Sequence, residues 1–241
     1  MSLNIKIVLV EPLYQGNVGS VTRVMKNFGF SDIVLVNPCK LEGEARAMSS
    51  HAHDVLESAR ITSSLAEAVE NASIVIGTTG ITGLKHDEHT RMPYYTPREL
   101  KKKLTGMSGT VAILFGREDQ GFNNNELGSC DMILTIPTSD VYQIMNLSHA
   151  AGIVLYELSD IKAGDKPLAR GFDLRLLYEH MGELLEDIDY PVHKKDKTML
   201  MFKRIFGRAE LIPREVQTLR GVIRRIRRKI KGDTFYQPDD Q

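Results

Sequence analysis

Three segments of the chain combine glycine with polar side chains close to an apolar run. They cover residues 16–23 (GNVGSVTR), 116–121 (GREDQG) and 137–148 (PTSDVYQIMNLS). A glycine-rich turn that opens a helix can hold an anion on its backbone N–H groups. Amide, carboxylate and guanidinium groups beside such a turn can orient a substrate or stabilise charge that develops during a reaction. These segments are therefore the first candidates for a functional site.

The first segment has glycines at Gly16 and Gly19, and Arg23 follows one helical turn later. Its G-x-x-G spacing is not the G-x-G-x-x-G fingerprint of dinucleotide-binding proteins, and it is not a Walker loop, which needs Gly-Lys-Ser/Thr. The sequence therefore does not support an NAD-dependent enzyme or a P-loop NTPase. Arg23 is within reach of a ligand held by the turn, although its alternative role is a surface salt bridge.

The other two segments add further polar groups. Gly116 directly follows an apolar run and would let a ligand approach the backbone closely. Glu118 can orient Arg23 or a ligand, unless the segment is only a charged turn. Asn146 stands near the start of a helical pattern, where asparagine is also a preferred N-cap residue.

Short runs rich in β-branched residues recur along the first two-thirds of the chain, at residues 5–10, 33–36, 74–76, 111–115 and 133–136. Runs without strict polar alternation suit strands that are buried on both faces of a parallel sheet. Helical patterns accompany them at residues 18–28, 65–69, 98–104 and 146–158. This alternation predicts an α/β fold whose ligands bind in loops at the carboxyl ends of the strands.

A polar segment with Gly and Pro, KAGDKPL at 162–168, ends the alternation. Beyond it the pattern is helical at 172–185 and 198–206, and a last helix begins near Pro213, a favourable first-turn residue. We therefore expect an α/β domain over 1–161, a linker over 162–169 and a small basic all-α domain over 170–241. The last helix is expected to dock through Leu219, Ile223, Ile226 and Ile230.

The formal net charge is zero, since 31 Lys and Arg balance 31 Asp and Glu, but the charges are unevenly placed. Residues 203–231 hold eleven Lys and Arg against two Glu. A dense basic segment on an otherwise acidic chain is typical of an appendage that binds a polyanion. We expect RNA contacts from Arg224, Arg225, Arg227 and Arg228. The alternative is a solvated helix face that binds nothing.

Composition excludes several classes of protein. Apolar residues make up 42% of the chain and charged residues 26%, which is unlike a disordered or collagen-like protein. No apolar run approaches the ~20 residues needed to cross a bilayer, and the first residues lack the pattern of a secretory signal. Two cysteines, Cys39 and Cys130, are too few for a disulfide framework, which favours a location in the reducing cytoplasm.

Together, in this order and spacing, the three segments resemble the motifs of SPOUT-class S-adenosylmethionine-dependent RNA methyltransferases. The similarity is to the TrmH branch, whose members methylate ribose 2′-hydroxyls of tRNA and rRNA. It covers residues 4–160 and rests on VLVEPLYQGNVGSVTRVMKNFG, LFGREDQGFNNNEL and IPTSDVYQIMNLSHAAGIVLYEL. The E-P-x-x-x-G-N-x-G-S start and the basic helical extension are most similar to members that modify position 32 of the tRNA anticodon loop.

The resemblance implies a deep trefoil knot in the C-terminal half of the α/β domain, which general folding rules do not predict. It implies that the knot loops bind S-adenosylmethionine and that the knots of two subunits pack together in a homodimer. Carried over, the cofactor site falls on Thr78, Thr79, Gly80, Gly116, Ile136, Gln143, Ile144, Met145 and Leu147. No metal is needed, and the histidines at 51, 53, 86 and 89 lack matching carboxylate partners.

The resemblance also implies catalytic residues. Arg23 matches the arginine of the first motif, Asn17 and Glu118 match the residues that orient it and the substrate, and Arg91 is a second essential arginine. Because a guanidinium stays protonated, Arg23 is expected to stabilise a developing alkoxide and the neighbouring phosphate rather than to act as a base. Relatives often have serine where this chain has Ile144, so a hydroxyl role is lost or moved to Tyr142, Gln143 or Ser148.

The expected function is methyl transfer from S-adenosylmethionine to the ribose 2′-hydroxyl of a tRNA nucleotide, at position 32, with cytidine as the first candidate base and uridine as the second. Three alternatives stay open: a catalytically inactive RNA-binding protein on the same fold, a 2′-O-methyltransferase that acts on rRNA, and an unrelated α/β nucleotide-binding enzyme. The presence of Asn17, Arg23 and Glu118 speaks against the inactive protein, whereas Ile144 leaves room for it.

Overall fold

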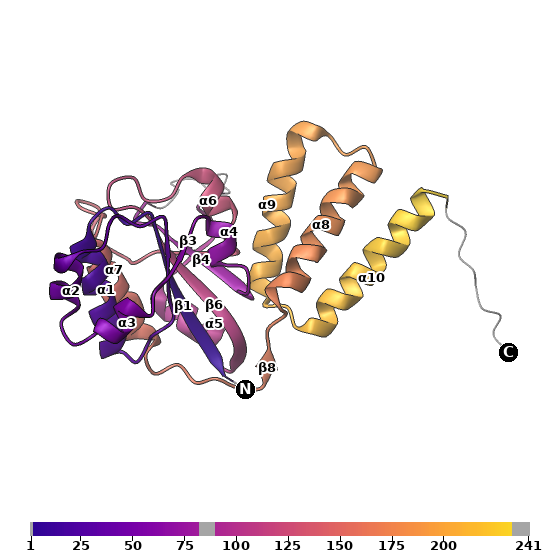
Figure 1. The fold of residues 1–241 in the computed structure, drawn as a ribbon. Helices are drawn as coiled ribbons and strands as arrows, with labels where there is room; N and C mark the ends of the chain where they lie inside the picture. The colour runs from indigo at the N-terminus through magenta and orange to yellow at the C-terminus, as the bar shows by residue number, and fades with distance from the viewer. Residues whose placement is uncertain (1, 82–89, 233–241) are drawn as a thin grey trace.

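A parallel sheet forms the centre of the first part of the chain in the computed structural model, which describes residues 2–81 and 90–232 (Figure 1). Its strands are β1 (Leu3–Val10), β2 (Ile33–Val36), β3 (Arg60–Thr62), β4 (Ile74–Thr78), β5 (Tyr94–Tyr95), β6 (Met107–Phe115), β7 (Met132–Leu134) and β8 (Lys166–Pro167). They lie in the order β3-β2-β1-β6-β4-β7-β5, and β8 pairs with β6. Every pairing between these strands is parallel, so the predicted α/β class is confirmed.

Helices cover both faces of the sheet (Figure 1). One face packs against α1 (Gln15–Asn27), α5 (Pro97–Leu104) and α7 (Leu147–Leu158), and the other against α4 (Leu65–Ala68) and α6 (Asn124–Gly128). Strand β1 shows why its sequence lacks polar alternation: Ile7 and Leu9 join the first cluster, while Val8 and Val10 join the second. The two short helices α2 (Gly43–Ser49) and α3 (His53–Glu57) pack against α1.

The five expected strands are present, and the three unexpected ones are only two or three residues long. Too few residues lie in β3, β5 and β8 to produce a recognisable pattern. Strand β8 falls in the segment expected to be a linker, where Lys166 and Pro167 pair with Met107 and Ser108 of β6. The chain therefore stays attached to the sheet until it enters the helices that follow.

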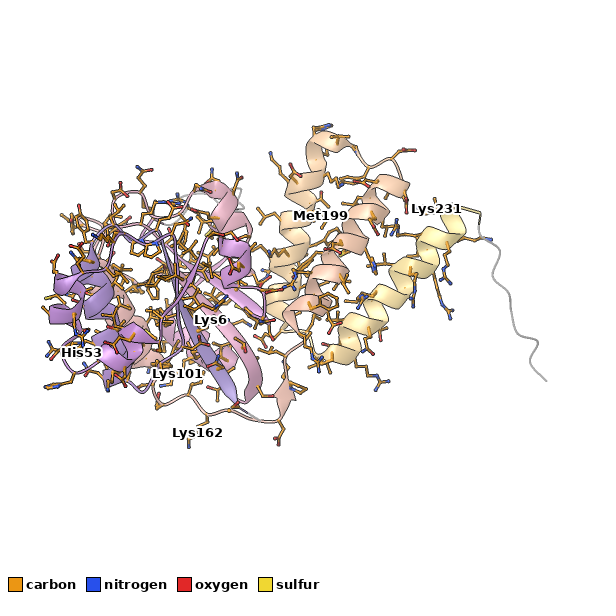
Figure 2. The ribbon with its side chains drawn as sticks, in the orientation of Figure 1. Lys6, His53, Lys101, Lys162, Met199 and Lys231 are labelled. Atoms are coloured by element: carbon orange, nitrogen blue, oxygen red, sulfur yellow. The ribbon has the colours of Figure 1, made fainter. Side chains whose placement is uncertain are left out.

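Three helices make up the described part of the C-terminal region: α8 (Gly171–Asp187), α9 (Val192–Ala209) and α10 (Pro213–Ile230). Helices α8 and α9 stand against the sheet domain, and α10 leads away from it to Lys231 (Figures 1 and 2). Of the four residues expected to dock α10, Ile223 is buried and Leu219 packs against the same cluster, which also contains Val216. The expectation is wrong for Ile226 and Ile230, which stay exposed because α10 diverges from the helix bundle.

None of the helices in the described ranges is both long enough and apolar enough to span a bilayer.

The glycine pair of the first segment serves packing. Helix α1 begins at Gln15, so Gly16 and Gly19 lie inside it rather than in a turn before it. A Cβ atom on Gly19 would lie 2.1 Å from the carbonyl oxygen of Ala45 in α2, and one on Gly16 would lie 2.7 Å from Oε1 of Glu44. The expectation of an anion-binding glycine turn is therefore wrong here, because α2 occupies the space beside these glycines.

Gly19→Ala should lower the free energy of unfolding by about 1–3 kcal/mol, the usual cost of overpacking, because α1 and α2 must separate. Urea denaturation followed by circular dichroism measures this, since the chain has no tryptophan. Gly221→Ala is the matched control: it lies inside α10 with nothing within 4 Å of its Cβ position, so it should gain about 0.5–1 kcal/mol from helix propensity. Equal effects of the two changes would contradict the packing role.

Candidate active site

A cavity of about 200 Å³ lies where the loops after β4, β6 and β7 meet. This is the carboxyl edge of the sheet, where α/β proteins bind their ligands. All nine residues expected to bind the cofactor line this one cavity: Thr78, Thr79, Gly80, Gly116, Ile136, Gln143, Ile144, Met145 and Leu147. The structure thus brings together residues from three distant parts of the chain, and their role in binding stays a prediction.

The cavity is lined by both apolar and charged side chains. Phe115, Leu134 and Leu147 contribute the apolar part, whereas Glu118 and Arg91 contribute charge. The Arg91 guanidinium donates a hydrogen bond of 3.5 Å to the carbonyl oxygen of Ile81. Such a wall can hold a flat apolar ring and a polar chain at the same time.

Residues 82–89 are not described. His86 and His89, which were considered as metal ligands, fall in this range and so lie outside the described residues. The Nδ1 atom of His53 lies 2.8 Å from the Ser49 hydroxyl oxygen.

A chain of hydrogen bonds ties the three motif segments to one another. The Asn17 amide donates to Oε1 of Glu118 at 2.8 Å, and the backbone N–H of Leu13 donates to Oε2 of the same carboxylate, also at 2.8 Å. The Asn146 amide donates to the Asn17 oxygen at 3.1 Å. Glu118 therefore fixes the start of α1 to the loop after β6, and Asn17 extends the connection to the start of α7.

Asn146 caps α7, as considered from the sequence, and it also contacts the first segment. Its side-chain oxygen accepts hydrogen bonds from the backbone N–H of Ser148 at 2.9 Å and from the Ser148 hydroxyl at 2.7 Å, which caps α7. Its amide group still reaches Asn17. One side chain thus sets both the helix start and the position of the third segment.

Arg23 does not join this group within one chain. It is exposed on α1, it does not line the cavity, and it makes no hydrogen bond or ion pair with another described residue. The expectation that Glu118 orients Arg23 is not met in a single chain, where the Glu118 carboxylate bonds to Asn17 and Leu13 instead.

Gly116 has a structural reason to be glycine apart from any ligand. A Cβ atom there would lie 2.7 Å from the carbonyl carbon of Gly121 and 3.0 Å from the nitrogen of Phe122. The loop after β6 turns back on itself at this point, and Arg117 pairs with Gly121 across the turn. Substitution of Gly116 would deform the loop before it touched a ligand.

Arg117 holds that loop in place, and the sequence analysis missed it. Its guanidinium donates to Oε2 of Glu11 at 2.8 Å, to both carboxylate oxygens of Glu126 at 3.0 and 2.9 Å, and to the Gly121 carbonyl at 3.2 Å. Glu126 also closes a capping box with Asn123 at the start of α6. The N-x-x-E spacing of that box is visible in the sequence, but nothing in the sequence shows that Arg117 meets Glu126.

The ion pair affects the ionisation of both partners. Burial alone would raise the pKa of the Glu126 carboxyl, but hydrogen bonds from Arg117 and from the backbone N–H of Asn123 lower that pKa overall. The hydrogen bonds that Arg117 donates to Glu126 and Glu11 raise the pKa of its guanidinium. Both groups therefore stay charged at neutral pH, and the loop stays clamped.

The four arginines expected to bind RNA are not equivalent. Arg224 and Arg228 are exposed on α10, where each makes no hydrogen bond to another described residue. Arg227 instead donates to Oδ2 of Asp187 at 2.6 Å and to the Glu183 carboxylate, so it joins α10 to α8. Two acidic residues of α8 therefore already pair with Arg227, and its contact with RNA stays a prediction. Arg225 is exposed and has an interaction of its own.

Comparison with protein families assigns both parts of the chain. Residues 4–156 match the model of the SpoU rRNA methylase family. Residues 172–235 match the model of the C-terminal domain of the tRNA methyltransferase TrmJ.

Individual relatives are similar over nearly the whole length. The chain is 38% identical over 227 residues to the tRNA (cytidine-2′-O-)-methyltransferase TrmJ of Methanocaldococcus jannaschii, covering 91% of this chain and 98% of that protein. It is 31% identical to the tRNA (cytidine/uridine/adenosine-2′-O-)-methyltransferase TrmJ of Pseudomonas aeruginosa, covering 98% of each. The crystal structure of TrmJ from Z. mobilis ZM4 superposes with a TM-score of 0.75 at 28% identity, covering 92% of this chain and 98% of that one.

Arg117→Met should lower the free energy of unfolding by about 1–3 kcal/mol at pH 7, the scale of hydrogen bonds to a charged group. Because the pKa of Glu126 is lowered by folding, the clamp contributes fully above its ordinary value near 4.5 and is lost as pH falls through the lower folded value. The difference between wild type and variant should therefore shrink below about pH 4.5. Urea denaturation at pH 7, 5, 4 and 3 measures it.

The control for this series is Arg46→Met. Arg46 pairs with Glu57 at an exposed site, so its loss should cost less than about 1 kcal/mol. A difference between wild type and Arg117→Met that stayed constant from pH 7 to pH 3 would contradict the clamp.

Proposed function

The chain belongs to the SpoU methylase family and, over nearly its full length, to the TrmJ-type tRNA 2′-O-methyltransferases, and we propose from that premise that it methylates position 32 of the anticodon loop. The methyl acceptor is the ribose 2′-hydroxyl of cytidine, and uridine is the second base to be tested. The observation that carries the proposal is the single cavity at the carboxyl edge of the sheet, to which all three motif segments contribute.

The cofactor of the proposed reaction is S-adenosylmethionine, which supplies the methyl group on a sulfonium. The lining of the cavity fits it: Leu134, Ile136 and Leu147 suit an adenine ring, and the glycines at 80 and 116 leave backbone groups within reach of a ligand. Backbone N–H and C=O groups at these loops can recognise the adenine edge without any charged side chain.

The loops around the cavity form the trefoil knot in this proposal. Support comes from contacts between segments that are far apart in the chain. The backbone N–H of Thr79 donates to the Leu134 carbonyl at 2.9 Å, and the Thr135 hydroxyl donates to the Thr79 carbonyl at 2.9 Å. The loop after β4 and the loop after β7 are therefore bound closely together.

A homodimer completes the proposed site. Large apolar side chains are exposed near the cavity on the loop before α7, where Val141 is 94% and Tyr142 is 77% exposed. Tyr14, next to α1, and Tyr156, on α7, are exposed as well. Side chains of this kind favour burial against another protein surface, and a second copy would also bring an Arg23 from outside the chain.

In the proposed mechanism, Arg23 of one subunit acts at the cavity of the other. Its guanidinium stays protonated, so it stabilises the alkoxide that develops on the 2′-oxygen and the adjacent phosphate. Glu118, Asn17 and Asn146 hold the loops that align the ribose. Alignment of the two reacting groups lowers the barrier further, since the reaction needs in-line attack.

The three C-terminal helices bind tRNA in this proposal, and the partner surface is the exposed part of α10. Arg224 and Arg228 supply cations that no described carboxylate neutralises. Contacts from these side chains to phosphates would hold the tRNA without reading its sequence.

Arg23→Ala should leave cofactor affinity nearly unchanged and lower methyl transfer by roughly a hundredfold, the scale of losing an electrostatic donor in the transition state. A tritiated-methyl assay on unmodified tRNA with cytidine or uridine at position 32 measures transfer, and calorimetry with S-adenosylhomocysteine measures binding. Arg46→Ala, an exposed arginine on α2, is the control and should keep wild-type activity. Wild-type transfer by Arg23→Ala would contradict its role.

Mixing two inactive variants tests whether Arg23 acts between subunits. Gly80→Val should block the cavity, because its Cβ lies 3.2 Å from Cδ1 of Ile144 and 3.3 Å from the Gln143 carbonyl oxygen. Cofactor affinity should fall at least tenfold, or about 1.4 kcal/mol. Heterodimers of Gly80→Val and Arg23→Ala chains should regain one working site. No recovery would mean that each site is built within one chain.

Neutralising Arg224 and Arg228 together to glutamine should weaken tRNA binding and lower the slope of log affinity against log salt concentration by about 1.4–1.8, since each phosphate contact contributes roughly 0.7–0.9. Filter binding between 50 and 300 mM salt measures the slope. The control is the double change of Arg46 and Arg60 to glutamine, both of which pair with acidic residues on the sheet domain. An unaltered slope in the α10 variant would show that tRNA is held elsewhere.

A further inference from the structure

Arg204 of α9 crosses from the C-terminal helices into the sheet domain. Its Nη2 atom donates to the carbonyl oxygens of Leu127 and Thr90, each at 2.9 Å. The residue is only 4% exposed, and neither its Nε nor its Nη1 atom has a hydrogen-bond partner among the described residues. Burial lowers the pKa of this guanidinium. Removing its charge from water costs free energy, which the two hydrogen bonds offset in part.

Neither carbonyl group lines the cavity itself, but each belongs to a segment that supports part of its wall. Thr90 directly precedes Arg91, which lines the cavity and bonds to the loop after β4. Leu127 lies in α6, next to Glu126, and Glu126 clamps Arg117 in the loop after β6. A single nitrogen atom of Arg204 thus connects both segments to α9.

We propose that Arg204 is a positioning residue: it sets the distance between the Arg91 segment and α6, and so couples the docking of the C-terminal helices to the shape of the cofactor cavity. This inference rests on the proposed function for the identity of the ligand. The juxtaposition itself, one guanidinium bonded to both segments, does not depend on that identity.

The helices do not need Arg204 to stay docked. A Cβ atom on Gly207 would lie 2.6 Å from the carbonyl oxygen of Asp131, the residue directly before β7. The backbone of α9 therefore packs directly against the start of that strand. Lys103 of α5 pairs with Glu210 at 2.5 Å, and the Tyr178 hydroxyl donates to Oδ1 of Asp131 at 3.4 Å. These contacts hold the interface independently, so loss of the two Arg204 bonds should loosen the cavity walls while the domains remain together.

The test compares Arg204→Met with Lys197→Met in the full chain. Methionine fills the same space without donors, and Lys197 is an exposed residue of the same helix with no hydrogen bond to another described residue. Hydrogen exchange of the free protein should speed up at least threefold in peptides covering 90–95 and 117–128 of Arg204→Met, while peptides from α10 and all peptides of Lys197→Met stay at the wild-type rate.

Ligand binding gives the second measurement. Affinity for S-adenosylhomocysteine should fall about tenfold in Arg204→Met, whereas tRNA affinity should stay within twofold of wild type. The thermal midpoint should remain within about 4 °C, the shift that about 1 kcal/mol produces in a chain of this size. If Arg204→Met does not fold, Arg204→Gln, whose shorter side chain does not reach both carbonyl oxygens, should show the same faster exchange in the same two segments.

The outcomes separate the two proposals. If a folded Arg204 variant exchanges at the wild-type rate in both segments, the proposed role of Arg204 is overturned. The role is also overturned if the wild-type protein binds S-adenosylhomocysteine and the variant exchanges faster but binds it with unchanged affinity. Failure of the wild-type protein to bind S-adenosylhomocysteine would instead overturn the proposed function, and the exchange measurement would still decide whether Arg204 holds the two segments.

Discussion

The hydrogen bonds that Asn17 donates to Glu118 and that Asn146 donates to Asn17 are the interactions on which the candidate site depends. Parallel strands bring their carboxyl ends to one edge of the sheet, but this alone does not fix the conformation of the loop that follows each strand. One carboxylate and two amides remove that freedom, because each amide donates and accepts in a fixed direction. The starts of α1 and α7 and the loop after β6 are thereby held as one unit.

A second set of contacts holds the loop after β6 in place. Arg117 fixes the turned-back loop to Glu11 and Glu126, and α6 carries Glu126. Helix α9 reaches α6 in turn through Arg204. The polar groups at the cavity are therefore held by rigid elements through buried or half-buried contacts, as precise binding sites require. A loop tethered only by its own residues would spread over several conformations.

The sheet and the cavity lining could be predicted from the sequence, whereas the contacts between side chains could not. The strand runs were visible because Ile7 and Val8 face different cores and both must be apolar. The nine cavity residues came from similarity to a family, which transfers positions along the chain. Gly19 was misread as part of a ligand turn because a glycine needed for helix packing has the same sequence signature. The roles of Arg117 and Arg227 depend on partners distant in sequence, which no local pattern reveals.

The position of Arg23 is best understood from what surrounds it. Within a single chain, Asn17, Glu118 and Asn146 are hydrogen-bonded to one another, and Arg23 stays exposed on α1. Val141 and Tyr142 are exposed on the loop that enters α7. A reaction that develops negative charge needs a cation at the cavity. Arg91 and Arg117 line it, but Arg117 is already paired with Glu11 and Glu126. The proposed second subunit would account for both features at once, since it would bury the apolar side chains and bring a free guanidinium to an edge where the local carboxylate already accepts two hydrogen bonds.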